Sequence, residues 1–111
     1  MKIVKEIDQE INDLIKEVKR DSTKNEVEAI KRKVSFLRQC KLYIETEPRE
    51  EFIKSEKIKT EERIKLIPAH YKDWQVGRNL TKYADPYKSY LNEMGLTNLN
   101  ASLKTLNYLL D

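Results

Sequence analysis

The chain has 111 residues, enough for one domain with a modest core but not for two such cores. Two glycines and three prolines are too few for a turn-rich β-sandwich or barrel, and 37% charged residues fit helices with broad polar faces. A net charge of +3 is too small to indicate nucleic-acid binding unless the basic residues gather on one face. The sequence predicts an all-α fold, a small bundle of four to six helices built on a long antiparallel helical hairpin.

The cellular location is predicted from what the chain lacks. Cys40 is the only cysteine, so no intramolecular disulfide can form, which fits a reducing compartment. Residues 1–6 become charged too soon for a secretory signal, and no apolar run approaches the ~18 residues of a membrane span. We therefore expect a cytoplasmic protein that does not enter a membrane. The abundance of lysine, isoleucine and asparagine suggests a bacterial origin.

The first predicted helix covers residues 2–20. Its apolar residues step by three and four positions, as in the seam of a coiled coil: Val4, Ile7, Ile11, Leu14 and Val18. This seam extends over only about two and a half heptads, fewer than a coiled coil normally needs. Two interpretations remain: packing inside the same chain, or a self-association seam that makes a homo-oligomer.

The second predicted helix covers residues 24–46 and begins at a capping box formed by Thr23 and Glu26. Its apolar arc is broad, which indicates contact with more than one neighbouring helix. The polar side carries a basic group that is either a solvated face or a phosphate-contacting patch for nucleic acid: Lys31, Arg32, Lys33, Arg38 and Lys41.

A corner at residues 45–51 separates this helix from a third, at about 48–67. Thr46 or Glu47 can serve as N-cap, with Pro48 in the first turn. A short corner predicts that residues 27–67 form the antiparallel hairpin. We expect the N-terminal helix and a helix at 99–110 to cover its broad apolar side together, and we expect function at any part left uncovered.

The composition changes near Pro68. Within one domain of residues 1–111, residues 1–67 form long charged helices, whereas residues 68–111 form an aromatic- and leucine-rich C-terminal sub-region. A kinked or short helix is predicted after Pro68 and a stop at Gly77. Trp74 lies between them and is either a core anchor, which we favour, or an interface residue.

Residues 77–84 are predicted as a loop, and Asp85-Pro86 as the start of the next helix. Gly95 should end that helix in the left-handed conformation, and Thr97 or Asn98 should cap the last one. Residues 87–106 resemble a helix-turn-helix of the phage-repressor kind, which implies DNA binding. They depart from it at Leu91, where a small residue is usual, and at Lys104, where a buried apolar residue is usual. An ordinary capped αα-hairpin explains the same residues.

Catalytic chemistry has little support. His70 is the only histidine and completes no metal set, and it is the only imidazole that could activate Cys40 as a nucleophile. Glycines at 77 and 95 alone cannot form a phosphate-binding loop. No catalytic, metal or cofactor-binding residue is therefore predicted. The sequence favours a non-enzymatic protein–protein interaction or accessory protein that self-associates, and a small nucleic-acid-binding regulator is the alternative.

Overall fold

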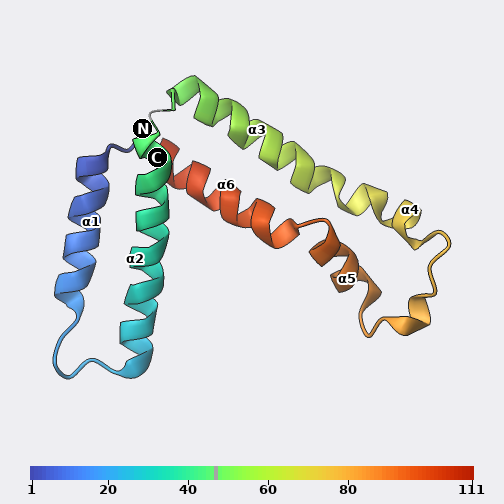
Figure 1. The fold of residues 1–111 in the computed structure, drawn as a ribbon, viewed down its shortest axis with the longest axis horizontal. Helices are drawn as coiled ribbons and strands as arrows, with labels where there is room; N and C mark the ends of the chain where they lie inside the picture. Colours follow the sequence, from blue (N-terminus) through green and yellow to red (C-terminus); the bar gives the residue numbers. More distant parts are fainter. Residues whose placement is uncertain (47) are drawn as a thin grey trace. The chain divides into compact units, whose positions relative to one another are not determined.

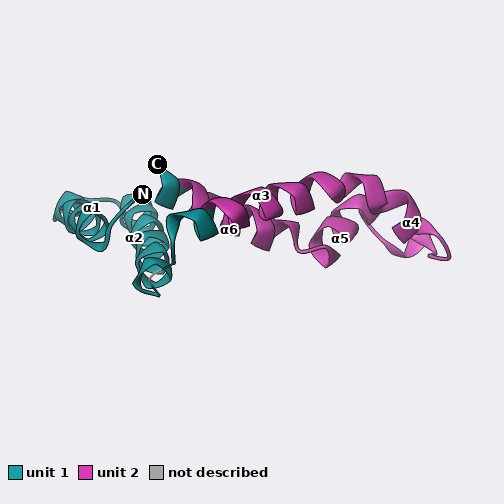
Figure 2. Cartoon of the chain, turned by 90° about the horizontal axis from the view of Figure 1, so that it is seen from above, with its two compact units in different colours: residues 1–53, 108–111 teal, residues 54–107 magenta. Residues whose placement is uncertain are grey.

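The computed structural model describes residues 1–46 and 48–111, and this part of the chain is helical with no β-strand. The all-α prediction is confirmed. The elements in chain order are α1 (Val4–Glu17), α2 (Lys24–Glu45), α3 (Glu50–Leu66), the 3₁₀ turn η1 (Pro68–His70), α4 (Tyr71–Gln75), the 3₁₀ turn η2 (Leu80–Lys82), α5 (Pro86–Glu93) and α6 (Leu96–Leu110). The chain divides into two compact units, unit 1 of residues 1–53 and 108–111 and unit 2 of residues 54–107 (Figure 2). The change of composition at Pro68 does not coincide with this division.

Unit 1 is built on the antiparallel pair of α1 and α2 (Figure 1). Both helices begin at residues whose backbone amides are capped by nearby side chains. The Glu6 carboxylate accepts from the Ile3 amide at 3.1 Å, and Thr23 and Glu26 exchange side-chain-to-amide hydrogen bonds of 3.2 and 3.3 Å. The predicted capping box is therefore confirmed. These bonds satisfy amides that the first helical turn leaves without carbonyl partners.

The hairpin is not the one predicted for residues 27–67, because α2 pairs with α1. Two sequence features explain the error. α1 offers a regular apolar stripe, whereas α3 leaves Phe52, Ile58 and Leu66 more than half exposed and has no continuous stripe. The corner also differs, since the Thr46 hydroxyl donates to the Tyr43 carbonyl at 2.6 Å and so closes α2 instead of opening α3.

Helix α3 begins later than predicted, at Glu50, so Pro48 precedes it instead of occupying its first turn. The Arg49 carbonyl accepts from the Ile53 amide at 3.1 Å and supplies the first helical bond. The alternative N-cap, Glu47, lies outside the described residues.

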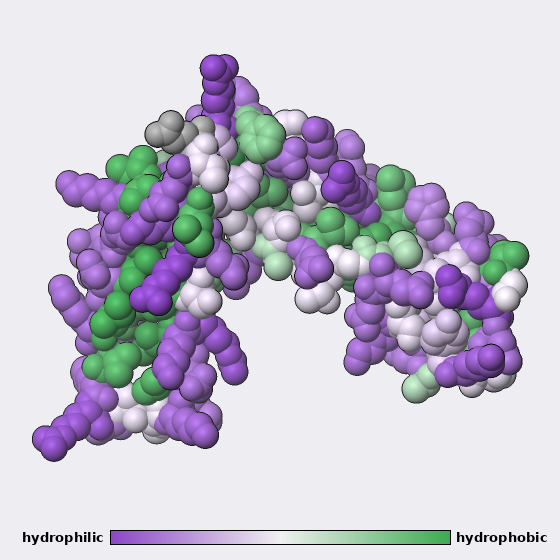
Figure 3. Space-filling view, in the orientation of Figure 1, coloured by the Kyte–Doolittle hydropathy of each residue, from purple (hydrophilic) through white to green (hydrophobic). Residues whose placement is uncertain are grey.

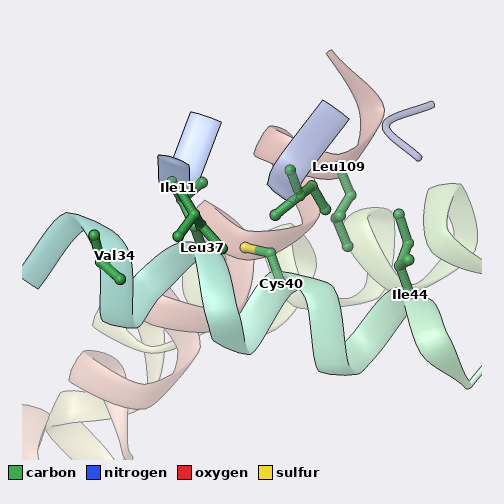
Figure 4. Close-up of a cluster of buried hydrophobic side chains, with 7 residues drawn as sticks. Ile11, Val34, Leu37, Cys40, Ile44 and Leu109 are labelled. Atoms are coloured by element: carbon green, nitrogen blue, oxygen red, sulfur yellow. The ribbon is translucent and has the colours of Figure 1, made fainter. Parts of the chain in front are cut away.

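The C-terminal end of the chain completes the core of unit 1. Leu109 is fully buried, and Figure 4 shows it with Ile11 on the same side of α2 as Leu37 and Cys40. The Leu109 carbonyl also accepts from the Lys2 amide at 2.8 Å, which ties the two ends of the chain together. We predicted that the N-terminal helix and the last helix would together cover the hairpin of residues 27–67, and they do so for this part of α2.

Unit 2 is organised around aromatic side chains. Trp74 and Tyr90 are 8% and 1% exposed and pack at a centroid distance of 5.6 Å, so the prediction that Trp74 is a core residue is confirmed. The Tyr90 hydroxyl donates to the carbonyl of Ile67, where α3 gives way to η1 at Pro68. Half-buried residues surround this cluster: Tyr71, Leu80, Tyr83, Leu91, Leu96 and Leu99.

Glycine, proline and aspartate determine where the helices of unit 2 begin and end. Gly77 and Gly95 have φ of 75° and 71°, so both adopt the left-handed conformation, which was predicted for Gly95. The Asp85 carboxylate accepts from the Lys88 amide at 3.1 Å and caps α5 as predicted. Two details were wrong: the predicted loop 77–84 contains η2, and α6 begins at Leu96 directly after Gly95. Thr97 and Asn98 therefore lie in the first turn of α6 and do not cap it.

Candidate functional site

Unit 1 contains a groove of about 840 Å³, which we call the α1–α2 groove. Figure 3 shows hydrophobic side chains gathered along α1 and α2 between hydrophilic ones. The groove is lined by Ile15, Val18, Val27, Ile30, Lys31, Val34, Ser35, Arg38, Gln39 and Leu42.

The groove exists because α1 covers only part of the apolar surface of α2. α2 is also the longer helix, with 22 residues against 14 in α1. Leu37, Cys40 and Ile44 turn to the core, where α1 and Leu109 bury them. The lining residues of α2, from Val27 to Leu42, recur every three or four positions and so form a second stripe along the helix. Val34 belongs to both stripes and marks where they meet.

Three large apolar side chains of the groove face solvent. Ile15 is 50% exposed, Val18 43% and Leu42 65%. Isolated exposed apolar side chains are ordinary on protein surfaces. These three instead share one groove with the half-buried Val27 and Ile30, and contiguous apolar surface of this kind marks interaction sites.

The charges at the groove have one sign. Lys31 and Arg38 line it, the other polar lining residues are the uncharged Ser35 and Gln39, and no carboxylate lines it among the described residues. Glu28 lies 3.7 Å from the Lys31 ammonium on the adjacent helical turn. Both of these side chains are largely exposed, so that pair neutralises Lys31 only weakly.

The predicted self-association seam is mostly used inside the chain. Ile7 and Ile11 are buried in the unit 1 core, and Val4 and Leu14 are half-buried against it. Val18 alone of the five is exposed, and it lies in the α1–α2 groove. The intrachain interpretation therefore accounts for the seam up to Leu14.

The predicted basic group is spread over α2 and does not share one face. Lys31 and Arg38 line the α1–α2 groove, whereas Lys33 lines a second hollow of about 330 Å³ together with Glu10, Asp13 and Glu17. Arg32 is exposed and lines neither of them.

Lys41 is engaged with α1. Its ammonium lies 2.8 Å from Asp8, and a hydrogen bond to that carboxylate, reinforced by their attraction, raises the pKa of Lys41. The basic excess of the chain lies elsewhere: residues 54–107 hold 10 Lys/Arg and 6 Asp/Glu, whereas residues 1–53 and 108–111 hold 12 and 13.

Sequence reasoning missed Leu42, Ser35 and Gln39 as part of a site. The signal was present, because Leu42 continues the spacing of Val34 and Arg38 at intervals of four residues. Leu42 was not assigned to the core face, and nothing in the sequence showed that this second stripe would lack a covering helix.

Unit 2 has its own polar cluster at the edge of its aromatic core. The Arg78 guanidinium lies over the Trp74 ring at 4.3 Å from its centroid and 3.7 Å from the Glu93 carboxylate. The Trp74 indole donates to the same carboxylate, so Glu93 joins both side chains. These contacts hold α4, the following turn and α5 together, which is a structural role.

Cys40 and His70, the two residues considered for catalysis, belong to different units. Cys40 is fully buried in unit 1, whereas His70 is exposed in unit 2 and lies 4.0 Å from Asp73. Among residues 1–46 and 48–111, no three His, Cys, Asp or Glu side chains gather as metal ligands would. Over the same residues, no helix has the length and apolar character that crossing a membrane requires.

The resemblance of residues 87–106 to a helix-turn-helix involves leucines that have a packing role. Leu91, Leu96 and Leu99 pack against the aromatic cluster of unit 2, around the turn at Gly95. DNA binding through this segment stays a prediction.

No protein family matches the chain, and comparison with curated proteins and with solved structures likewise gives no match.

Proposed function

We propose that this chain is a non-enzymatic protein that binds another polypeptide in the α1–α2 groove. The observation that carries the proposal is the row of exposed Ile15, Val18 and Leu42 beside the half-buried Val27 and Ile30. An amphipathic helix that lays its apolar face in such a groove is a common mode of peptide recognition. The groove is a part of the apolar side of α2 that no helix among the described residues covers, and the sequence led us to expect function at such a part.

The groove has the length that a helical partner needs. From Val27 to Leu42 it follows 16 residues of α2, whose ends lie about 22 Å apart at the rise of an α-helix. A partner helix of about four turns would cover that distance and bring an apolar residue to the groove at each turn. A peptide that binds by adding a strand would instead need an exposed strand edge, and the described part of the chain contains no strand.

The test uses display of a library of helical peptides, with Leu42→Arg as the groove variant. Leu66→Arg is the matched control, because Leu66 is a 54% exposed helical leucine assigned to unit 2. We expect selected peptides to bind the wild-type chain and the control but not Leu42→Arg. Peptides that bind all three chains equally, or a failure to select any binder, would refute the proposal.

Self-association is the second candidate, favoured by the exposure of Val18 and Ile15 at the end of the predicted seam. Sedimentation velocity over a range of micromolar concentrations tests it. A second copy bound in the groove would give a dimer that Leu42→Arg dissociates, whereas a monomer at every concentration rules this candidate out.

Nucleic-acid binding through the basic side of α2 is tested separately. It predicts a gel shift at low salt that weakens as salt is added, because phosphate contacts release counterions. Loss of the shift on replacing Arg32 and Lys33 with glutamate would support it. Absence of a shift at low salt would exclude it.

The proposed location is the cytoplasm. The basis is the cysteine count, because Cys40 is the single cysteine of the sequence and no intramolecular disulfide can form. Chains without disulfides are usual in reducing compartments.

A further inference from the structure

We propose that the occupant of the α1–α2 groove is an amphipathic helix of another protein whose apolar stripe is flanked by acidic side chains. This inference rests on the proposed function and adds the chemistry of the partner. It is carried by the sign of the charges at the groove, together with the spacing of those charges along α2.

Lys31 and Arg38 are seven residues apart, so they project from the same side of α2, about 10.5 Å apart along its axis. Carboxylates two turns apart on a partner helix would meet both cations. Arg38 can take a carboxylate in bidentate fashion, which fixes the register of the partner as well as attracting it. Because no carboxylate lines the groove among the described residues, an acidic partner meets no like charge in the lining.

The uncharged side chains beside the two cations allow close approach. Ser35 lies between Lys31 and Arg38 in the sequence, Gln39 follows Arg38, and neither Ser35 nor Gln39 is charged. A small serine leaves room for an apolar side chain of the partner, as small residues do where helices approach closely. The partner would therefore present leucine-sized residues along its stripe and acids at its borders.

A second copy of the chain fits this groove less well. In a two-fold interface the same surface meets itself, so Lys31 and Arg38, the charged residues among the described lining, would face the same two cations of the other copy. Like charges at an interface select against that partner, whereas opposite charges speed association with the correct one. Charge complementarity thus favours a different, acidic helix.

The experiment uses two designed helical peptides of about 18 residues, long enough to match the groove. Both carry leucines at i, i+4, i+7 and i+11, and the flanking positions are glutamate in one and lysine in the other. Fluorescence anisotropy measures binding of each labelled peptide to the full chain at about 50 mM and about 500 mM salt. The variants are Lys31→Glu with Arg38→Glu and, as charge-matched control, Lys72→Glu with Lys82→Glu on unit 2.

We expect the acidic peptide to bind more tightly than the basic one and to lose affinity at high salt. Each exposed ion pair is worth up to about fivefold, so reversing both cations should weaken the acidic peptide by about tenfold or more and favour the basic peptide. The control pair should leave this preference unchanged. Circular dichroism of each variant verifies that the helices are retained.

Three outcomes would overturn the inference, and they differ in what they leave standing. Equal binding of both peptides, abolished by Leu42→Arg, would refute the acidic chemistry but leave a helix-binding groove. If the chain forms a dimer and the peptides dissociate it, a second copy of the chain is the occupant of the groove. Binding of neither peptide would refute the proposed function as well.

Discussion

Leu109 links the C-terminal end of the chain to the core of unit 1, and its truncation gives the sharpest test of the fold. Its side chain is fully buried beside Ile11 of α1 and Leu37 and Cys40 of α2. Replacing a buried leucine with alanine removes apolar contacts and leaves a cavity, which destabilises by about 2–5 kcal/mol. Because Leu109 is fully buried against α1 and α2, we expect about 3 kcal/mol for Leu109→Ala.

Cys40 provides a local assay for this change. It is the only cysteine in the sequence, and it is fully buried in the same core. A thiol reagent reaches it only when that core opens, so the labelling rate is proportional to the opening equilibrium. A loss of about 3 kcal/mol raises that equilibrium about 150-fold, and Leu109→Ala should accelerate Cys40 labelling by this factor.

The matched control is Leu42→Ala. Leu42 is a helical leucine that is 65% exposed, so its truncation removes little buried surface and should change the labelling rate less than about threefold. Urea unfolding followed by circular dichroism supplies an independent value for each variant. Equal labelling rates for Leu109→Ala and Leu42→Ala would refute the role of Leu109 in closing the core.

Three further predictions concern Tyr90, Gly95 and Tyr108. Tyr90→Phe leaves the buried Ile67 carbonyl without its donor and should destabilise unit 2 by about 1–3 kcal/mol in urea unfolding followed by Trp74 fluorescence, whereas Tyr87→Phe, at an exposed ring, should not. Gly95→Ala should destabilise by about 1 kcal/mol in thermal unfolding because of its φ of 71°, and Gly95→Asn by less; equal losses would contradict the left-handed explanation. Burial, and then the Glu10 carboxylate, raise the pKa of Tyr108, so its stabilising effect is complete below pH 10.0 and is lost as pH rises above it. The urea midpoint of wild type should therefore fall above pH 10.0 more steeply than that of Tyr108→Phe, and parallel pH profiles would contradict this assignment.

Much of the local structure could be predicted because its causes are local. Thr23 with Glu26, Asp85 before Pro86, and the glycines at 77 and 95 each act within a few residues, through a cap, a fixed φ or a left-handed turn. Trp74 could be assigned to a core because a lone tryptophan contributes a large apolar surface.

The errors concern pairing, which depends on distant residues. The stripe of α1 was visible in the sequence, but its spacing suits a partner inside the chain as well as one outside it. α2 pairs with α1 and not with α3 because the apolar residues of α1 form a continuous stripe along one face of the helix. The exposure of Phe52 and Ile58 shows that α3 lacks such a stripe.

The sequence by itself determined an all-α chain, the ends of most helices and the broad apolar arc of α2, because helical periodicity and capping are properties of short segments. Only the tertiary structure decided how much of that arc is covered. It placed Ile7, Ile11 and Leu109 on one stripe of α2 and left the α1–α2 groove, with Lys31 and Arg38 in its lining, open. The reason is physical: burial is decided by the elements that arrive from elsewhere in the chain, and no local pattern records whether a second helix will come.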